Sequence, residues 1–190
     1  GRVVLFKDVA DEALRRVTAT SKEKNPNLSD AVRADVAKAV GLGSLAYAML
    51  AVDNSRDTVF DMDVALSFEG RTGPYIQNAH VRAASILKKF EGLKVESLEA
   101  ATFNFELTSH EIELIELLSR FPAVVEQAAK EYRPMIMATY AYDLASAFHS
   151  FYHAVSVLKA ETDEIRDARL RLVAAARQTL ANALALLGIT

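Results

Sequence analysis

The side chains that could do chemistry here are histidines, tyrosines and arginines, because the chain has no cysteine and so no disulfide, zinc ribbon or cysteine nucleophile. His149 and His153 are one helical turn apart, a spacing that can chelate zinc. Position 150 is Ser150, however, so the H-E-x-x-H motif of zinc proteases is absent. We expect both histidines to face solvent on a helix, with no metal bound. Asp61 and Asp63 form a D-x-D pair, which is common in loops and helix caps, and we expect a structural role for it.

The common catalytic signatures are missing. The sequence has no G-x-x-x-x-G-K-[ST] loop and no G-x-S-x-G elbow, and Gly41 and Gly43 lack the third glycine of a dinucleotide fingerprint. No histidine follows a glutamate by three residues, so a carboxylate di-metal bundle is unsupported. We therefore predict no catalytic residue and no bound cofactor in this chain.

One row of polar residues could bind RNA. Tyr142, Ser146, His149 and His153 recur at helical spacing, about 120° or more from the apolar stripe centred near Leu144. The row should face solvent or a partner, and exposed tyrosine and histidine rings can stack on the bases of single-stranded RNA. A mixed surface or a contact between helices explains the row equally simply, and for the row alone we favour that interpretation.

The elements that must position these residues are helices. Seven glycines and four prolines in 190 residues indicate long regular elements with few tight turns, and leucine and alanine are abundant. Periodicity and capping residues predict helices at 8–20, 29–40, 44–50, 72–90, 108–121, 122–132, 133–155 and 162–187. Residues 53–68 are mixed, with a possible extended piece at 58–60 and a helical turn or two at 61–67, and 91–105 should be a loop or frayed helix.

These helices predict an all-α fold. Residues 108–188 should form an antiparallel bundle, with Gly188 ending the last helix, and the helix at 74–90 should add a member. That helix has Thr72 as its N-cap and Pro74 in its first turn. Its polar stripe consists of Tyr75, Asn78, Arg82 and Lys89. The core row expected for the last helix is Ile165, Leu172, Ala176, Leu180 and Leu184.

Charge and hydropathy limit the partners. With 22 basic and 25 acidic residues, the net charge is −3, which argues against holding nucleic acid mainly by neutralising phosphates. A protein that reads a few bases through a local patch remains compatible with this charge. No apolar run approaches the roughly 18 residues of a membrane span, and no basic n-region precedes an apolar h-region, so we expect neither a membrane span nor a signal peptide. We expect a soluble, cytoplasmic protein.

One segment carries a family resemblance. Residues 66–77 read LSFEGRTGPYIQ and are followed by Ala79, His80 and Arg82. This resembles the L-S-F-E-G-x-T-G-P-Y-L-Q-Y-A-H-x-R run of the arginyl-tRNA synthetases, which are class I aminoacyl-tRNA synthetases. Residues 121–125, 144–158 and 166–189 are similar to the family's F-P-x-V-V stretch, its L-A-x-x-F-N-x-F-Y segment and its last helix.

The resemblance implies a C-terminal fragment of such an enzyme. Residues 1–72 would be a smaller, mostly helical stem-contact region that follows the ATP loop, and residues 73–190 would be the helical anticodon-binding domain. The parent enzyme would attach arginine to its tRNA with ATP and magnesium, whereas this fragment alone should be inactive. The implied partner is tRNA for arginine, with no DNA, no membrane and a monomeric state.

The resemblance also implies site residues. Arg82 matches the family's arginine on the anticodon side, while Asn78 stands where the family usually has an aromatic residue. Tyr75, Gln77 and His80 match the motif but could serve only to brace the helix. The full set of expected tRNA contacts is Arg82, Asn78, Tyr75, Lys89, Tyr142, His149 and His153.

Two other functions remain open. The bundle could belong to another class I synthetase, of the cysteinyl or methionyl type, although the LSFEGRTGPY run argues against this. Alternatively, the chain could be a free-standing helical module that binds other proteins. A pull-down from cell extract would recover either tRNA or a protein and would separate these possibilities.

Overall fold

A computed structural model describes residues 5–57, 59–90 and 105–189, which form seven helices and no strand. The helices are α1 (Phe6–Lys24), α2 (Asp30–Leu50), α3 (Met62–Ala65), α4 (Gly73–Lys89), α5 (Ser109–Glu131), α6 (Pro134–Ala154) and α7 (Asp163–Leu186). The all-α prediction is confirmed. Most of the segment expected to be a loop or frayed helix, 91–104, lies outside the described residues.

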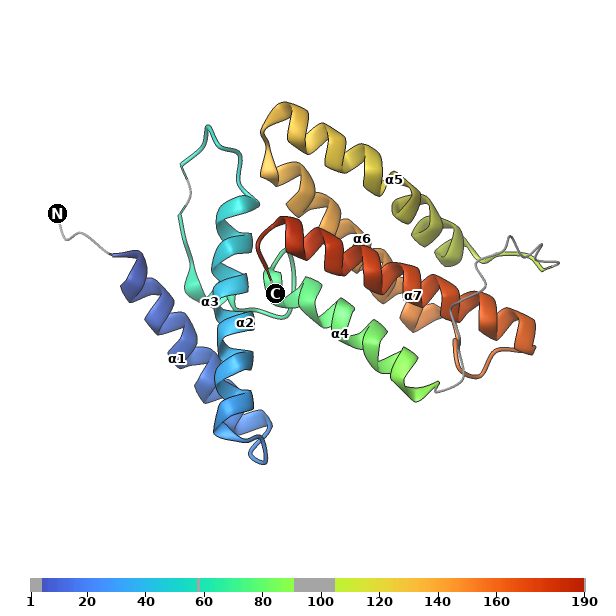
Figure 1. Cartoon of the computed structure of the whole chain (residues 1–190), viewed down its shortest axis with the longest axis horizontal. Coiled ribbons are helices and arrows are strands. Elements are labelled where there is room, and N and C mark those ends of the chain that lie inside the picture. The colour runs from blue at the N-terminus through green and yellow to red at the C-terminus, as the bar shows by residue number, and fades with distance from the viewer. Residues whose placement is uncertain (1–4, 58, 91–104, 190) are drawn as a thin grey trace.

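The helices form a pair joined to a bundle (Figure 1). Helix α1 packs lengthwise on α2, while α6 contacts α2, α4, α5 and α7 and so lies at the centre of the bundle. Helices α4 and α7 run antiparallel side by side, and α5 covers the outer side of α6. The end of α7 returns to the start of α4, next to α2.

Helix starts follow the capping residues closely. The side chains of Ser29, Thr72, Thr108 and Thr162 each accept a backbone N–H from the first turn of the helix that follows. Thr108 belongs to a complete capping box, because the side chain of Glu111 also accepts the Thr108 backbone N–H. Since unpaired N–H groups at a helix start need acceptors, these residues determine where the helices begin.

The expected break in the second helix is absent. Helix α2 continues through Gly41 and Gly43 to Leu50. A Cβ atom on Gly73 would lie only 2.8 Å from the Gly43 carbonyl oxygen, so α2 and the start of α4 touch backbone to backbone. Glycine at positions 43 and 73 therefore permits this close approach of two helices rather than a turn.

The proline in α5 does not end that helix either. We expected separate helices on the two sides of Pro122, but α5 runs from Ser109 to Glu131 with Pro122 inside. An internal proline removes one hydrogen bond and costs roughly 3 kcal/mol. Leu114 and Val124 are buried on either side of it, and the Phe121 ring lies 5.7 Å from that of Tyr140 on α6. Packing against the bundle therefore offsets the cost.

Two smaller expectations also change. The helical turn expected at 61–67 is present as the short helix α3, but the described residues 59–60 of the proposed extended piece belong to no strand. In α7 the core face is rotated from the expected row, because Leu170 and Val173 are fully buried while Ile165 and Leu172 are only partly buried. Position 188 is as expected, with φ of 69° at Gly188 just after α7.

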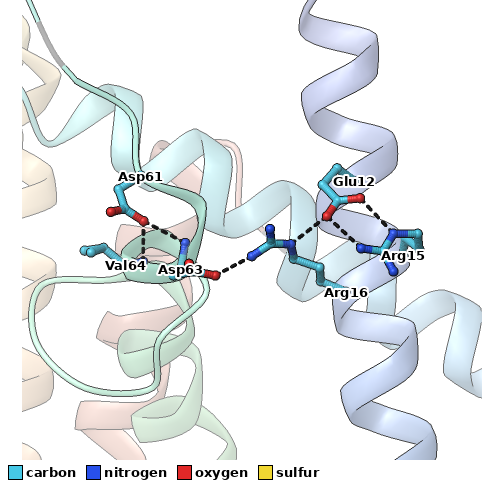
Figure 2. A network of polar contacts seen from close by, with 6 residues as sticks. All are labelled: Glu12, Arg15, Arg16, Asp61, Asp63 and Val64. Atoms are coloured by element: carbon cyan, nitrogen blue, oxygen red, sulfur yellow. Dashed lines mark hydrogen bonds and ion pairs between the residues drawn. The ribbon is translucent and has the colours of Figure 1, made fainter.

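A polar network fixes the segment around α3 against α1 (Figure 2). Asp61 caps α3 by accepting the backbone N–H groups of Asp63 and Val64. The Asp63 carboxylate pairs with Arg16 on α1, and Arg16 also donates to Glu12 at 2.7 Å. The structural role expected for Asp61 and Asp63 is confirmed, and their network holds the chain leading to α4 beside α1.

Candidate nucleic-acid interface

An open groove of about 760 Å³ lies along the contact between α4 and α6. It is lined by Phe68, Tyr75, Asn78, Arg82, His110, Ser146, His149, Ser150, His153 and Ala154. Five of the seven side chains expected to contact tRNA line this one groove, although they come from two helices, α4 and α6, that are not consecutive in the chain.

Arg82 is held from two sides in this groove. Its guanidinium carbon lies 4.7 Å from the centre of the Tyr152 ring, within the range of a cation–π contact. Its Nη1 atom lies 3.2 Å from Nδ1 of His149. Because a guanidinium can only donate, Nδ1 must accept, and the His149 ring is therefore neutral in this arrangement. These contacts leave other N–H donors of Arg82 for a ligand.

Tyr75 forms one wall of the groove within a cluster of rings. Its ring centre lies 4.8 Å from that of His149, edge to face, and 5.5 Å from that of Tyr142. On its far side, Tyr142 stacks against the Arg71 guanidinium at 4.8 Å. Tyr75 is half-buried and both supports α4 against α6 and offers the groove an aromatic surface.

The structure corrects the placement of His149. We expected it to face solvent with His153, but only His153 is exposed, and His149 is half-buried against Tyr75 and Arg82. Burial, together with the positive charge of Arg82, lowers the pKa of His149 below its ordinary value of 6.5. The row from Tyr142 to His149 is thus a contact between helices, the simpler alternative considered above, because α4 packs along it.

The other expected contacts are placed as follows. Asn78 is half-buried at one wall of the groove. Lys89 is exposed at the end of α4, two turns beyond Arg82, and does not line the groove. Tyr142 does not line it either and acts through Tyr75. One motif residue braces α4 instead, because Gln77 donates to the Ala39 carbonyl of α2 at 2.9 Å. His80 is half-buried, and burial together with the charge of Arg177 on α7 lowers the pKa of His80.

Sequence reasoning missed four residues around this groove. Phe68 and His110 line it, Tyr152 lies beneath Arg82, and Arg71 supports Tyr142. Phe68 matches a fixed position of the family motif and Tyr152 stands in the segment 144–158, so the resemblance contained a signal for both, whereas Arg71 occupies the variable position of that motif. His110 is the second residue of α5, and only the folded bundle brings it to the groove.

The groove suits an organic ligand better than a metal ion. No group of three or more histidine or carboxylate side chains in the described part of the chain could hold a metal. Aromatic walls and one fixed guanidinium instead match the faces and edges of a nucleobase. Among the described helices, none is long and apolar enough to cross a lipid bilayer.

The helices and this groove together define an all-helical domain with an open groove lined by aromatic rings and a guanidinium. The family model described as the DALR anticodon binding domain matches residues 76–190, which is more than half of the chain. The chain belongs to this family, and the recognition drawn from the LSFEGRTGPY run is confirmed.

Curated relatives agree with the family. The chain is 46% identical to the arginine–tRNA ligase of Pyrococcus abyssi over 183 residues, which cover 96% of the chain and 29% of that protein. It is 38% identical to the arginine–tRNA ligase of Proteus mirabilis over 190 residues, covering 100% of the chain and 32% of that protein. The chain thus spans about a third of the length of these relatives.

Solved structures agree as well. The arginyl-tRNA synthetase of Thermus thermophilus superposes with a TM-score of 0.86 at 37% identity, covering 98% of the chain and 32% of that structure. The arginyl-tRNA synthetase of Plasmodium falciparum superposes with a TM-score of 0.84 at 23% identity, covering 99% of the chain and 33% of that structure, which supports the fold alone.

Proposed function

We propose that this chain is the anticodon-reading part of an arginine–tRNA ligase and that the groove between α4 and α6 receives a base of the anticodon. The observation that carries this proposal is the convergence of Tyr75, Asn78, Arg82, His149 and His153 on one groove. The family membership and the arginine–tRNA ligase relatives support the same function.

Each groove residue has a chemical role in this proposal. Arg82 donates hydrogen bonds to the base edge from a guanidinium that Tyr152 and His149 already hold in place. Tyr75 and His153 offer ring faces for stacking, and Asn78 offers an amide that can donate and accept. Because Asn78 has no aromatic ring, stacking in this groove falls to Tyr75 and the histidines. Lys89 contributes only a point charge to the RNA backbone.

The wider proposals concern the whole enzyme. Residues 1–72 would contact the tRNA stem and residues 73–190 its anticodon. The parent enzyme would use ATP and magnesium to attach arginine, and this chain would be inactive alone. The described residues contain no group of three or more histidine or carboxylate side chains that could hold a metal ion, so we propose no magnesium site in this chain. We propose a cytoplasmic, monomeric enzyme that binds tRNA for arginine rather than DNA or a membrane. The net charge of −3 fits a surface that selects bases while other contacts hold the backbone.

Titration of the chain with a fluorescent hairpin that copies the anticodon arm of an arginine tRNA tests this proposal. Wild-type chain should bind the hairpin, and Arg82→Ala should weaken binding by about 10- to 100-fold, the equivalent of one lost base contact. Lys89→Ala on the same helix is the matched control and should weaken binding less, chiefly by reducing its salt dependence. Equal affinity of wild type and Arg82→Ala would contradict the proposal.

A further inference from the structure

A second hollow adjoins the groove. It has a volume of about 540 Å³, within the roughly 300–1,000 Å³ range of small-molecule sites. Its walls are formed by α1, α2 and the segment before α4, with Val17, Leu28, Val36, Val40 and Leu66 as apolar lining. Phe68 and Asn78 line both this hollow and the groove between α4 and α6, so the two spaces share a wall.

One polar group in the hollow lacks a partner. Ser21 on α1 lines the hollow and is only 7% exposed, and its Oγ atom has no hydrogen-bond partner among the described residues. A buried hydroxyl without a partner is destabilising, since it has lost water and gained nothing in return. A ligand with a donor or an acceptor at its edge would satisfy this hydroxyl, whereas a purely apolar ligand would not.

The rim of the hollow carries a positive charge next to an aromatic ring. The Lys24 ammonium lies 5.8 Å from the centre of the Phe68 ring and makes no ion pair with the described residues. Arg16, which also lines the hollow, is instead committed to Glu12 and Asp63 (Figure 2). Lys24 is therefore the basic group that can meet a phosphate, while Arg16 holds the wall in place.

We propose that this hollow takes the base of a second nucleotide of the same RNA strand. The inference rests on the proposed function, since it continues the strand from the groove past Phe68. Apolar walls would cover the faces of the base, Ser21 would bond to its edge, and Lys24 would neutralise the adjoining phosphate. A nucleotide fits these three features together, because its base has flat apolar faces and a polar edge and its phosphate carries a negative charge.

Filling the hollow tests the inference without touching the groove. Thr20 is exposed on α1 and lines the hollow, so Thr20→Trp should occupy it, while Ala19→Trp places the same ring on the next, non-lining position. Affinity is measured for anticodon-arm hairpins in which single loop nucleotides are made abasic. Removing a base that the wild type binds here should weaken binding about 10-fold, in keeping with one lost stacking contact.

The inference predicts one loop position at which removing the base no longer weakens binding to Thr20→Trp but still weakens binding to Ala19→Trp. Ser21→Ala should reduce the penalty at the same position while leaving the melting temperature unchanged or higher. A different abasic position should be coupled to Arg82→Ala. If only the Arg82-coupled position is found, the second site is refuted and the proposed function stands. If no position is coupled to Arg82, the proposed function itself fails.

Discussion

At the scale of single residues, Arg82 is the side chain whose surroundings say most about its use. Its guanidinium is fixed by the Tyr152 ring and by Nδ1 of His149, so little rotamer freedom remains to be lost when a ligand binds. An arginine that served only solubility would gain nothing from such restraint. His149 thereby acts as a positioning residue for Arg82, and its neutral ring is a requirement of the arrangement.

Acid should weaken the folded state through His149. Because burial and Arg82 lower the pKa of His149 below 6.5, the unfolded chain takes up this proton more readily than the folded chain. The unfolding free energy should therefore fall as the pH drops below about 6.5, and His149→Gln should fall less steeply over the same range. Urea unfolding between pH 7.5 and about pH 5 measures both slopes.

The control for this pH effect is His153→Gln, one turn further along α6 and exposed. His80 contributes in the same direction in every variant, so it cancels from the comparison. If His149→Gln and His153→Gln change the pH dependence of the unfolding free energy equally, the role assigned to His149 is wrong.

How far the sequence predicts these residues depends on what positions them. Arg82 and Tyr75 stand in the LSFEGRTGPY motif and its continuation, so their identity was predictable from that segment. The burial of His149 was not predictable from the sequence. The helical spacing of α6 shows on which side of the helix His149 lies, but it does not show that α4 covers this side. Helix pairing involves residues distant in sequence, and periodicity within one helix carries no information about it.

At the scale of elements, starts of helices were predictable and their interruptions were not. Caps such as Thr72 and Thr108 act within one turn, so local sequence determines them. A glycine such as Gly43 or a proline such as Pro122 can either end a helix or lie inside one. The tertiary contacts of the neighbouring residues determine which of the two occurs. The same reasoning assigns Gly43 and Gly73 to a contact between α2 and α4.

Adding a methyl group to that contact should be costly. The Cβ of Gly73→Ala would lie 2.8 Å from the Gly43 carbonyl oxygen, and backbone cannot move aside as a side chain can. We expect a loss of about 1–3 kcal/mol in unfolding free energy, the usual effect of overpacking. Gly41→Ala is the matched control: its Cβ meets Leu14 at an ordinary 3.4 Å, and alanine favours a helix by roughly 0.5–1 kcal/mol. Chemical denaturation that found Gly73→Ala as stable as Gly41→Ala would refute the backbone contact.

At the scale of the whole molecule, one buried ion pair ties together three parts of the bundle. Arg169 on α7 donates to Glu111 at the start of α5 at 2.8 Å and to the Ser156 carbonyl after α6 at 2.9 Å. Burial alone would raise the pKa of Glu111, but hydrogen bonds from Arg169 and Thr108 outweigh it and hold this pKa below its ordinary value. Both side chains of the pair are buried, with Glu111 only 1% exposed.

Removing the arginine should destabilise the bundle. Arg169→Leu would leave Glu111 charged and buried without its cation, and breaking such a pair from one side typically costs about 3–5 kcal/mol. Arg171→Leu, two residues further along α7 and partly exposed, should change the unfolding free energy by less than about 1 kcal/mol. Thermal and urea unfolding of both variants decides the matter, and equal effects would show that the buried pair does not join the helices as described.

The net charge of −3 also acts at this scale, because a chain without an overall basic surface must obtain selectivity from a few local contacts.

The central claim is that the groove reads a base of the anticodon. The most direct measurement compares the affinities of wild type and Arg82→Ala for two hairpins, one with the normal middle anticodon base and one with an altered base. Wild type should prefer the normal base by about 1–3 kcal/mol, and Arg82→Ala should lose most of this preference. If Arg82→Ala weakens both hairpins equally, or neither, the guanidinium does not read the base and the account of the groove is wrong.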